Sequence, residues 1–396
     1  MTEPLIVEAA AFDELCDHIE RAGLVAFDTE FVSEFTYRPE LGLLQFATAE
    51  RLAAVDPYAV TDLGRWWRIM AGDEVAVIVH GGQAEVRFCR VATGERPRRL
   101  VDVQLAEGMR SRSYPLGYGP LVARVLGKRV SGKETRSDWR ARPLSPRQIR
   151  YALEDVEHVL KIWDRQRVAL ESLGRLSWAE QEFERLIDET IADLERPPWT
   201  RLPGWQKLSP RELAVATELA EWREREAERR DRNPRKLLRD DLVIELARRQ
   251  PRTYRDLMAT RDMNRTDYRK SADGFLACIE RGLAIEEHEL PRPEKSASSD
   301  ARREEQALGQ LLGLALSNRS AEVNIARTLL GTTSDLIDLI RRHVFGGRDG
   351  EPSRLSIGWR AEVCGDLLTD LLDGRIRLRV GDPQSDHPLV FEPVED

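Results

Sequence analysis

Residues 27–31 read Phe27-Asp28-Thr29-Glu30-Phe31 and end the apolar run that begins at Leu24. The run has the composition of a buried strand, so we expect the two acids at the end of that strand. Successive side chains of a strand point to opposite faces, which places Asp28 and Glu30 on one face and Phe27 on the other. Neighbouring carboxylates are costly unless water, a base or a cation offsets their charge. The pair alone is compatible with a metal site or with a solvent-exposed strand end.

The sequence around this pair alternates between strand and helix patterns, which indicates an α/β sheet domain. The predicted strands are Leu24 to Phe27, Leu41 to Phe46, Leu52 to Val55 and Val75 to Val79. Beyond residue 195 strand signals nearly vanish and amphipathic helices are expected. These helices are Glu212 to Arg230, Asp240 to Arg248, Ala301 to Ser317 and Glu362 to Leu372. An α/β domain followed by two small helical domains is therefore predicted.

Two proline-rich segments, 196–204 and 290–299, interrupt the helical patterns and predict linkers. After Val380 the chain carries five acids and no Lys or Arg, which predicts a loose acidic tail. The predicted domains are residues 1–196, 205–289 and 300–380, with the tail at 381–396.

The composition is that of packed globular domains, with 396 residues, 41% of them hydrophobic and 33% charged. A formal net charge of -8 argues against a protein that coats nucleic acid indiscriminately. The four cysteines lie far apart without a CxxC pair, so neither a zinc ribbon nor a disulfide framework is expected. The N-terminus has no basic leader pattern and no apolar stretch is long enough to span a bilayer. We expect a cytoplasmic protein without a membrane partner.

A second set of functional side chains lies in the segment Tyr151-Ala152-Leu153-Glu154-Asp155-Val156, which has helical spacing. Tyr151 and Asp155 are four residues apart and therefore share one helix face, where a phenol and a carboxylate can address one site. Taken alone, Tyr151 is also compatible with a half-buried packing residue.

Together the two motifs resemble those of the ribonuclease D family, in the tyrosine subgroup of the DEDD superfamily of 3′-5′ exonucleases. The first motif matches at Asp28-Thr29-Glu30-Phe31-Val32, Glu34, Thr36-Tyr37, Pro39, Leu41 and Leu43-Leu44-Gln45. The third motif matches at Ser137-Asp138-Trp139, Arg142-Pro143-Leu144, Gln148, Tyr151-Ala152 and Asp155-Val156.

Residues 208–263 resemble the HRDC domain, a small helical module that binds nucleic acid. The marker positions are Leu208-Ser209-Pro210, Leu219, Trp222-Arg223, Ala227, Arg232-Asn233-Pro234 and Leu237-Leu238. The segment Leu355-Ser356-Ile357-Gly358-Trp359-Arg360 with Gly365 is similar to a second, more divergent HRDC-like domain. The resemblance thus implies a ribonuclease H-like mixed sheet with flanking helices, followed by two small all-α HRDC-like domains.

The resemblance also implies an activity, namely 3′-5′ exoribonuclease trimming of structured RNA such as tRNA precursors, with release of nucleoside 5′-monophosphates. Two divalent cations, Mg²⁺ or Mn²⁺, would be held by the carboxylates, with Asp28 between them. Tyr151 would position the attacking water. The implied catalytic residues are Asp28, Glu30, Glu85, Tyr151 and Asp155, of which all but Tyr151 would be metal ligands.

The second motif departs from the family pattern, which has a strand, a His and then an Asp that opens a helix. Here Val77-Ile78-Val79-His80-Gly81-Gly82-Gln83-Ala84-Glu85 carries Glu85 in the aspartate position. The longer arm could displace a metal ion that demands near-ideal octahedral geometry. One alternative is therefore a catalytically weakened RNA-binding protein of the same fold. A second alternative is a DNA 3′-5′ exonuclease, because the superfamily that the chain resembles includes proofreading enzymes and DNA lacks only the 2′-OH. We interpret His80 as a hydrogen-bonded structural residue.

The stretch from Arg110 to Arg150 holds eleven basic residues and two acids, a local net charge of +9 in an acidic protein. It leads into the Tyr151 helix, where an RNA backbone needs counter-charge. The predicted nucleic-acid-binding residues are Arg129, Lys133, Arg136, Arg140, Arg142 and Arg147. Residues 127–134 have the GxxxxGK spacing of a phosphate-binding loop but lack its final Ser or Thr, so no nucleotide cofactor is expected.

Overall fold

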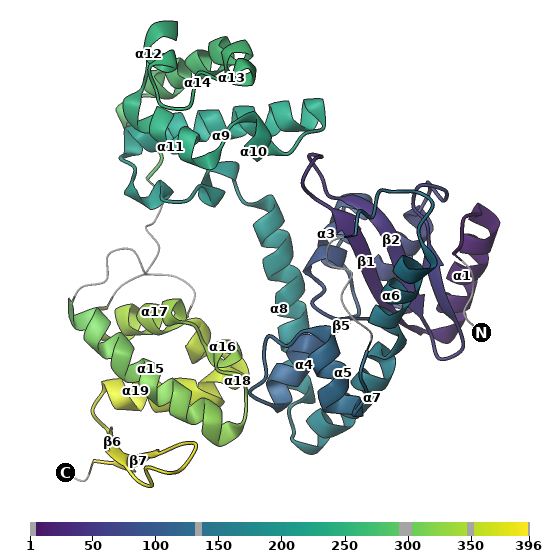
Figure 1. The fold of residues 1–396 in the computed structure, drawn as a ribbon. Coiled ribbons are helices and arrows are strands. Elements are labelled where there is room, and N and C mark those ends of the chain that lie inside the picture. The colour runs from purple at the N-terminus through teal and green to yellow at the C-terminus, as the bar shows by residue number, and fades with distance from the viewer. Residues whose placement is uncertain (1–4, 131–136, 293–302, 347–351, 395–396) are drawn as a thin grey trace.

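The N-terminal part of the chain is built on a five-stranded mixed sheet (Figure 1). The computed structural model describes residues 5–130, 137–292, 303–346 and 352–394. The strands are β1 (Leu24–Val32), β2 (Glu40–Ala47), β3 (Leu52–Val55), β4 (Ala76–Val79) and β5 (Leu100–Asp102), in the order β3-β2-β1-β4-β5. The β1 strand is central and pairs antiparallel with β2 and parallel with β4. The predicted α/β sheet is confirmed.

The structure corrects the expected end of the first strand. The β1 strand continues to Val32, so Asp28 and Glu30 lie within the strand and not at its end. Pairing with β2 extends it, from Ala26 opposite Ala47 to Val32 opposite Glu40, with an irregularity after Glu30. The strand β5 was not expected from the sequence. It has only three residues, which pair with β4, and so short a run gives little strand signal.

Helices cover both faces of the sheet. They are α1 (Ala9–Ala22), α2 (Gly64–Ala71), α3 (Gln83–Thr93), α4 (Val103–Arg110), α5 (Tyr118–Leu126), α6 (Pro146–Glu157), α7 (Val159–Ser172) and α8 (Leu176–Glu195). On one face, the Phe27 ring of β1 packs against Trp66 and Trp67 of α2. On the other face, Leu153 of α6 belongs to a buried cluster with Leu43 of β2. The long helix α8 leads from this part of the chain to the next (Figure 1).

The middle part of the chain is a helical unit with its own core. Its elements are η1 (Pro198–Arg201), η2 (Trp205–Lys207), α9 (Pro210–Arg230), α10 (Pro234–Leu237), α11 (Asp240–Arg249), α12 (Tyr254–Met258), α13 (Thr266–Lys270), α14 (Ala272–Ala284) and η3 (Glu287–Glu289). The α9 helix begins with a capping box between Ser209 and Glu212, which satisfies its first backbone donors. The apolar stripe of α9, with Leu219 at its centre, packs with α11 and α14.

The last part of the chain is helical and ends in a β-hairpin. Its elements are α15 (Arg303–Val323), α16 (Arg327–Leu330), α17 (Thr333–Val344), η4 (Arg354–Ser356), α18 (Gly358–Arg360), the π-helical turn η5 (Ala361–Gly365), α19 (Asp366–Leu372), β6 (Ile376–Val380) and β7 (Leu389–Pro393). The predicted loose tail after Val380 is therefore wrong for residues 389–393. They pair with β6, and Asn318 accepts a 2.8 Å hydrogen bond from the Leu389 backbone.

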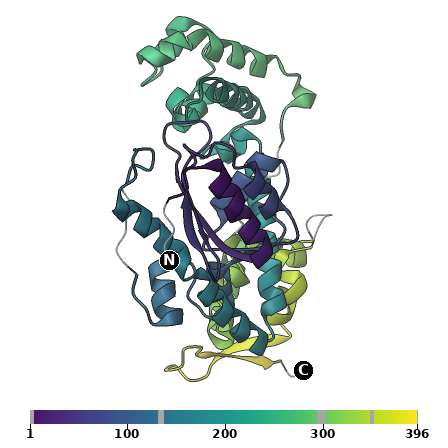
Figure 2. The ribbon, with the colours of Figure 1, turned by 90° about the vertical axis from the view of Figure 1, so that its right-hand side faces the viewer.

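The last helical unit packs directly on the sheet domain, and the two share one continuous apolar core. The Ala326 amide donates to the Gly108 carbonyl of α4 at 2.8 Å. Deeper in the contact, the buried Glu182 of α8 pairs with Arg360 at 2.7 Å. Figure 2 shows the middle unit at the opposite end of the molecule from the β6–β7 hairpin. In the described residues, no helix is both long and apolar enough to cross a membrane.

Candidate active site

The sheet and two helices bring the predicted acidic residues together. Asp28 and Glu30 point from β1 toward the α6 side of the sheet, and α6 carries Tyr151 and Asp155 one turn apart. The α6 helix starts where the sequence favours it, because Ser145 and Gln148 form a capping box and Pro146 opens the first turn. Strand alternation and helix spacing thus deliver two pairs of side chains to one place.

Glu85 reaches the same place from the other side of β1. It lies in the first turn of α3, where the positive end of the helix dipole favours a carboxylate. It is only 3% exposed and accepts a 2.6 Å hydrogen bond from the Thr29 hydroxyl. Side chains alternate along a strand, so Thr29 points to the opposite face from Asp28. Alternation alone therefore gave no reason to include Thr29 in the site.

The electrostatics show that the four carboxylates share one environment. Burial, and then the charges of Glu85, Asp155 and Glu30, raise the pKa of Asp28 well above its usual range. Burial and the charges of Asp155 and Glu85 raise the pKa of Glu30 to about 8. Burial raises the pKa of Glu85 to about 7 and that of Asp155 to about 6, while hydrogen bonds from Thr29 and Tyr151 oppose these shifts. Such a cluster gains stability from a cation.

Tyr151 stays close to this charge as a neutral phenol. Its hydroxyl donates to Asp155, and burial together with the charges of Asp155 and Glu30 raises its pKa above the usual value. On its other side lies the Trp139 ring, with 6.4 Å between the ring centroids. Tyr151 can therefore donate and accept hydrogen bonds at the carboxylate cluster without ionising.

The donor set fits divalent cations, since carboxylate oxygens are the ligands that Mg²⁺ and Mn²⁺ prefer. In the part of the chain that the structure describes, however, no three acidic, His or Cys side chains are already close enough to enclose one ion. Like-charged carboxylates repel one another, so a loosely arranged set is the expected resting geometry of the protein chain. Small side-chain rotations would be needed to complete a site.

Two neighbouring polar residues have structural roles. The His80 Nε2 donates to the Leu116 carbonyl at 2.8 Å, in line with the sequence interpretation. Asp102 accepts from the Gly81 and Gly82 amides at 3.1 Å and also caps α4. It therefore fixes the loop that precedes Glu85.

Tyr118 was missed by the sequence reasoning. Its hydroxyl donates to the Glu154 carbonyl at 2.7 Å and accepts from the His158 amide at 3.3 Å. It thereby joins α5 to the end of α6, next to Asp155. A lone tyrosine in a helix pattern carries no sequence signal for such a role.

The predicted RNA-binding residues differ from one another in their surroundings. Arg129 and Arg147 are exposed, whereas Lys133 and Arg136 lie outside the described residues. The Arg142 guanidinium pairs with Asp56 at 2.7 and 2.8 Å and stacks over the Tyr58 ring, which favours a structural role.

The local charge of +9 overstates the free positive charge of the 110–150 stretch. Arg110 and Arg124 both pair with the buried Glu107, and Arg112 pairs with Asp386 at 2.8 Å. Glu107 lies just before the counted stretch, and Asp386 is far from it in sequence. A charge count over residues 110–150 therefore includes neither acid.

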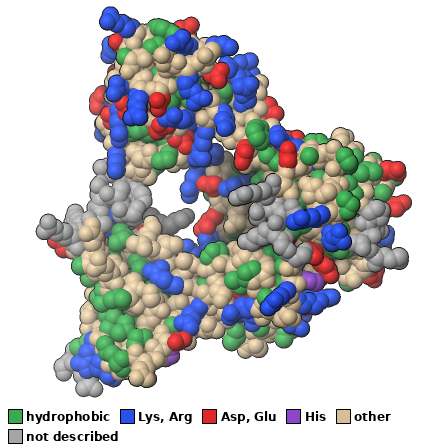
Figure 3. Space-filling view, in the orientation of Figure 1, with side chains coloured by type: hydrophobic (Ala, Val, Ile, Leu, Met, Phe, Trp, Pro, Cys, Tyr) green, Lys and Arg blue, Asp and Glu red, His purple; other side chains and the backbone are tan. Residues whose placement is uncertain are grey.

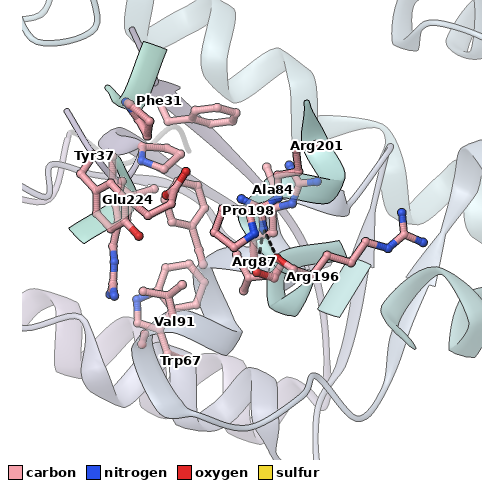
Figure 4. Close-up of a pocket in the computed structure, with 17 residues that line it drawn as sticks. Phe31, Tyr37, Trp67, Ala84, Arg87, Val91, Arg196, Pro198, Arg201 and Glu224 are labelled. Carbon is pink, nitrogen blue, oxygen red and sulfur yellow. Dashed lines mark hydrogen bonds between the residues drawn. The ribbon is translucent and has the colours of Figure 1, made fainter. Parts of the chain in front are cut away.

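A cavity of about 790 Å³ lies between α3, the β1–β2 connection and the middle unit (Figure 4). Phe31, Trp67 and Phe88 give it aromatic walls, and Tyr37 donates a hydrogen bond across it to Glu224. Its described lining includes none of the five predicted catalytic residues. The cavity is therefore an interdomain space on the Phe31 face of β1.

Comparisons with known proteins identify the class first. Residues 5–171 match the 3′-5′ exonuclease family and residues 212–279 match the HRDC domain. The chain is therefore a 3′-5′ exonuclease with a helical HRDC domain.

Full-length relatives identify the family. The chain is 32% identical to ribonuclease D of Gluconacetobacter diazotrophicus, over 95% of this chain and 94% of the relative. It is 29% identical to that of Zymomonas mobilis, over 95% and 96% of the two chains. The solved structure of Escherichia coli RNase D, an exoribonuclease involved in structured RNA processing, superposes with a TM-score of 0.83 at 27% identity, covering 94% of this chain and 99% of that one. The chain belongs to the ribonuclease D family and is a 3′-5′ exoribonuclease.

Proposed function

We propose that this exoribonuclease trims the 3′ ends of structured RNA such as tRNA precursors and releases nucleoside 5′-monophosphates. The observation that carries the proposal is the convergence of Asp28, Glu30, Glu85 and Asp155, each with a raised pKa, around the neutral Tyr151. The processing of structured RNA by the similar Escherichia coli enzyme supports the substrate class.

The family implies dependence on divalent metal ions, and we propose two ions, Mg²⁺ or Mn²⁺, held by these four carboxylates. When bound, such ions supply Lewis-acid stabilisation of the phosphodiester and a more acidic water. The chain contributes orientation: Asp155 accepts a hydrogen bond from the Tyr151 hydroxyl and so fixes the direction in which the phenol oxygen can itself accept. Tyr151 is then placed to hold the attacking water through that oxygen.

RNA is held, in this proposal, by residues away from the carboxylates. Arg129 and Arg147 are exposed on the sheet domain and carry no catalytic group, so they contribute phosphate contacts. We propose that residues 205–289 bind structured RNA, and that residues 300–380 form a second HRDC-like domain. The four cysteines are free and buried, which supports a reducing cytoplasm as the location.

Cleavage assays with matched variants test the catalytic assignment. We expect Asp28→Asn and Asp155→Asn to lower the rate at least about 100-fold on 3′-extended tRNA while RNA affinity changes only a few-fold. Asp164→Asn, which alters an exposed acid of α7, serves as the control and is expected to keep the wild-type rate. Near-normal cleavage by Asp28→Asn would refute the site.

The same assay tests the substrate and the metal. Matched RNA and DNA oligonucleotides differ in the 2′-OH that a protein can use for discrimination, and we expect the RNA to be degraded faster. Chelation is expected to abolish the activity, and added Mg²⁺ or Mn²⁺ to restore it. Equal rates on DNA would favour the DNA exonuclease alternative.

A further inference from the structure

The connection between β1 and β2, residues 33–39, begins three residues after Glu30 and is held by the middle helical unit. Asn233, at the start of α10, donates from its side-chain amide to the Ser33 carbonyl at 3.1 Å. The Asn233 backbone amide donates to the Phe35 carbonyl at 3.3 Å, and Asp231 accepts from the Tyr37 amide at 3.1 Å. The backbone of the connection is therefore held at three points by Asp231 and Asn233.

Phe35 is nevertheless 51% exposed at this fixed position. The Arg140 guanidinium lies over the ring, 4.3 Å from its centroid. One cation can cover only one face of a ring, so the exposed half is available for another planar group. Of the aromatic rings on β1 and β2, Phe27 and Phe46 are fully buried, and Phe31, 37% exposed, packs edge-on against Phe88.

A basic hollow adjoins the same connection. It measures about 450 Å³ and is lined by Glu34, Asn233, Arg235, Lys236, Arg239 and Arg265. Asn233 is thus both a wall of the hollow and the residue that holds Phe35. Figure 3 shows Lys and Arg side chains gathered over this middle unit.

Part of the positive charge in the hollow is unpaired. Arg235 pairs with Asp240, and Arg239 pairs with Asp262 at 3.1 Å. In the described part of the chain, neither Lys236 nor Arg265 has a carboxylate within salt-bridge distance, although Arg265 stacks over Tyr268. Phosphate groups are the anions that an exoribonuclease brings to such a position.

We propose that Phe35 and this hollow form a subsite for unpaired RNA upstream of the nucleotide being removed. Phe35 stacks on a nucleobase, and Lys236 and Arg265 contact the neighbouring phosphates. Stacking on an aromatic ring tolerates any base, which suits an enzyme that must degrade successive nucleotides. The location of the subsite relative to the scissile bond rests on the carboxylate site proposed above.

Equilibrium binding of a short fluorescent single-stranded RNA, measured in chelator with the Asp28→Asn background, tests the subsite without turnover. We expect Phe35→Ala to raise Kd about 5- to 100-fold, the range that loss of one base-aromatic stack gives. We expect Phe35→Trp to keep Kd within about 2-fold and its fluorescence to be quenched by RNA. Val168→Ala removes a side chain of α7 that is 58% exposed and is expected to leave Kd unchanged.

A series of RNAs, each with one abasic residue at a different position, distinguishes loss of base stacking from a disturbed conformation of residues 33–39. When the RNA carries one abasic residue at the stacked position, the effect of Phe35→Ala is expected to disappear, while at other positions it persists. An effect of equal size on every abasic RNA would overturn stacking, and so would an unchanged Kd for Phe35→Ala.

Salt and steady-state measurements complete the test. Lys236→Ala with Arg265→Ala is expected to reduce the slope of log Kd against log salt by about 0.7 per lost phosphate contact. With Asp28 intact, Phe35→Ala is expected to raise KM and leave kcat within about 2-fold. A lower kcat at unchanged KM would overturn the subsite in favour of a structural role. The binding measurements need no cleavage, so they test the subsite even if the four carboxylates do not bind metal ions.

Discussion

At the scale of single residues, the proposed active site is a concentration of charge that folding alone disfavours. Asp28, Glu30, Glu85 and Asp155 all have raised pKa values, since burial and mutual repulsion penalise their ionised forms. A packed domain gains nothing from this arrangement unless a ligand uses it. The hydrogen bond from Thr29 shows how the chain tolerates a glutamate in the aspartate position of the family. The backbone amides of Thr29 and Glu85 also donate hydrogen bonds to the Glu85 carboxylate.

Replacement of Glu85 by glutamine separates ligation from packing. Glu85→Gln keeps the shape of the side chain and an oxygen that can accept from Thr29, but it removes the charge. We expect the metal-supported cleavage rate to fall about 10-fold or more, while the melting temperature stays the same or rises. A wild-type rate would show that Asp28, Glu30 and Asp155 work without Glu85. Thr29→Val, which removes the hydrogen bond only, is the companion variant.

The raised pKa of Glu30 predicts how stability depends on pH in the metal-free protein. The folded state binds this proton more tightly than the unfolded state, because the pKa is about 8 in the fold and 4.5 without it. The stabilisation is thus fully present below about pH 4 and is lost as pH rises toward about 8. Relative to wild type, Glu30→Gln is expected to be near neutral at about pH 5 and stabilising at about pH 8.

Thermal melts of both proteins in chelator measure this difference, and the comparison cancels the titration of groups remote from Glu30. Added Mg²⁺ is expected to raise the melting temperature of the wild type more at about pH 8 than at about pH 5, because ionised carboxylates bind the ion. A difference between the two proteins that does not change with pH would contradict the assigned environment of Glu30.

At the scale of elements, the sequence predicted what depends on local pattern. Alternation located Asp28 and Glu30 on one face, and helical spacing brought Tyr151 and Asp155 together. The extension of β1 to Val32 could not be predicted, because it depends on pairing with a partner strand. For the same reason β7, a short apolar run within an acidic segment, was missed. The pairing of Arg142 with Asp56 joins residues far apart in sequence and left no local signal.

Gly42 of β2 shows how closely these elements approach one another. A Cβ atom at this position would lie 2.6 Å from the Trp139 Cβ and 3.0 Å from the Trp139 carbonyl oxygen. Gly42→Ala is therefore expected to destabilise the protein by about 1–3 kcal/mol and to lower kcat, since Trp139 packs beside Tyr151. Denaturant unfolding and steady-state rates measure both effects.

Gly72→Ala is the matched control, because its added Cβ would meet only ordinary contacts of 3.4 Å. We expect it to change neither stability nor kcat appreciably. If Gly42→Ala behaved in the same way, the contact between β2 and the Trp139 segment would be looser than the structure indicates.

At the scale of the whole molecule, the three parts of the chain form two large cores, beside a small buried cluster between α6 and the sheet. The sheet domain and the last helical unit share one core, whereas the middle unit has its own. The middle unit touches the sheet domain through polar contacts, such as those of Asp231 and Asn233 with residues 33–37. Units with separate cores can unfold separately, whereas units that share one core unfold together. The middle unit is therefore expected to unfold separately from the carboxylate site, and the last unit to unfold with it.

Glu182 tests this division, since it is the buried charge that joins the sheet domain to the last unit. It is 1% exposed and pairs with Arg360 at 2.7 Å, and it accepts from the Trp359 indole at 3.2 Å. Glu182→Ala leaves the Arg360 guanidinium buried without its partner, a change that costs about 3–5 kcal/mol. Glu184→Ala, in the same helix, removes only an exposed pair with Arg96 and is expected to cost at most about 1 kcal/mol.

Hydrogen exchange followed by mass spectrometry distinguishes local from shared unfolding in Glu182→Ala. Because one core spans both parts, we expect protection to fall together in the sheet strands and in α15 to α19, while α9, α11 and α14 keep wild-type protection. Loss confined to α15 to α19 would show that the last unit unfolds by itself. Loss that included α9 and α14 would show that the polar contacts of Asp231 and Asn233 couple the middle unit to the rest as strongly as an apolar core does.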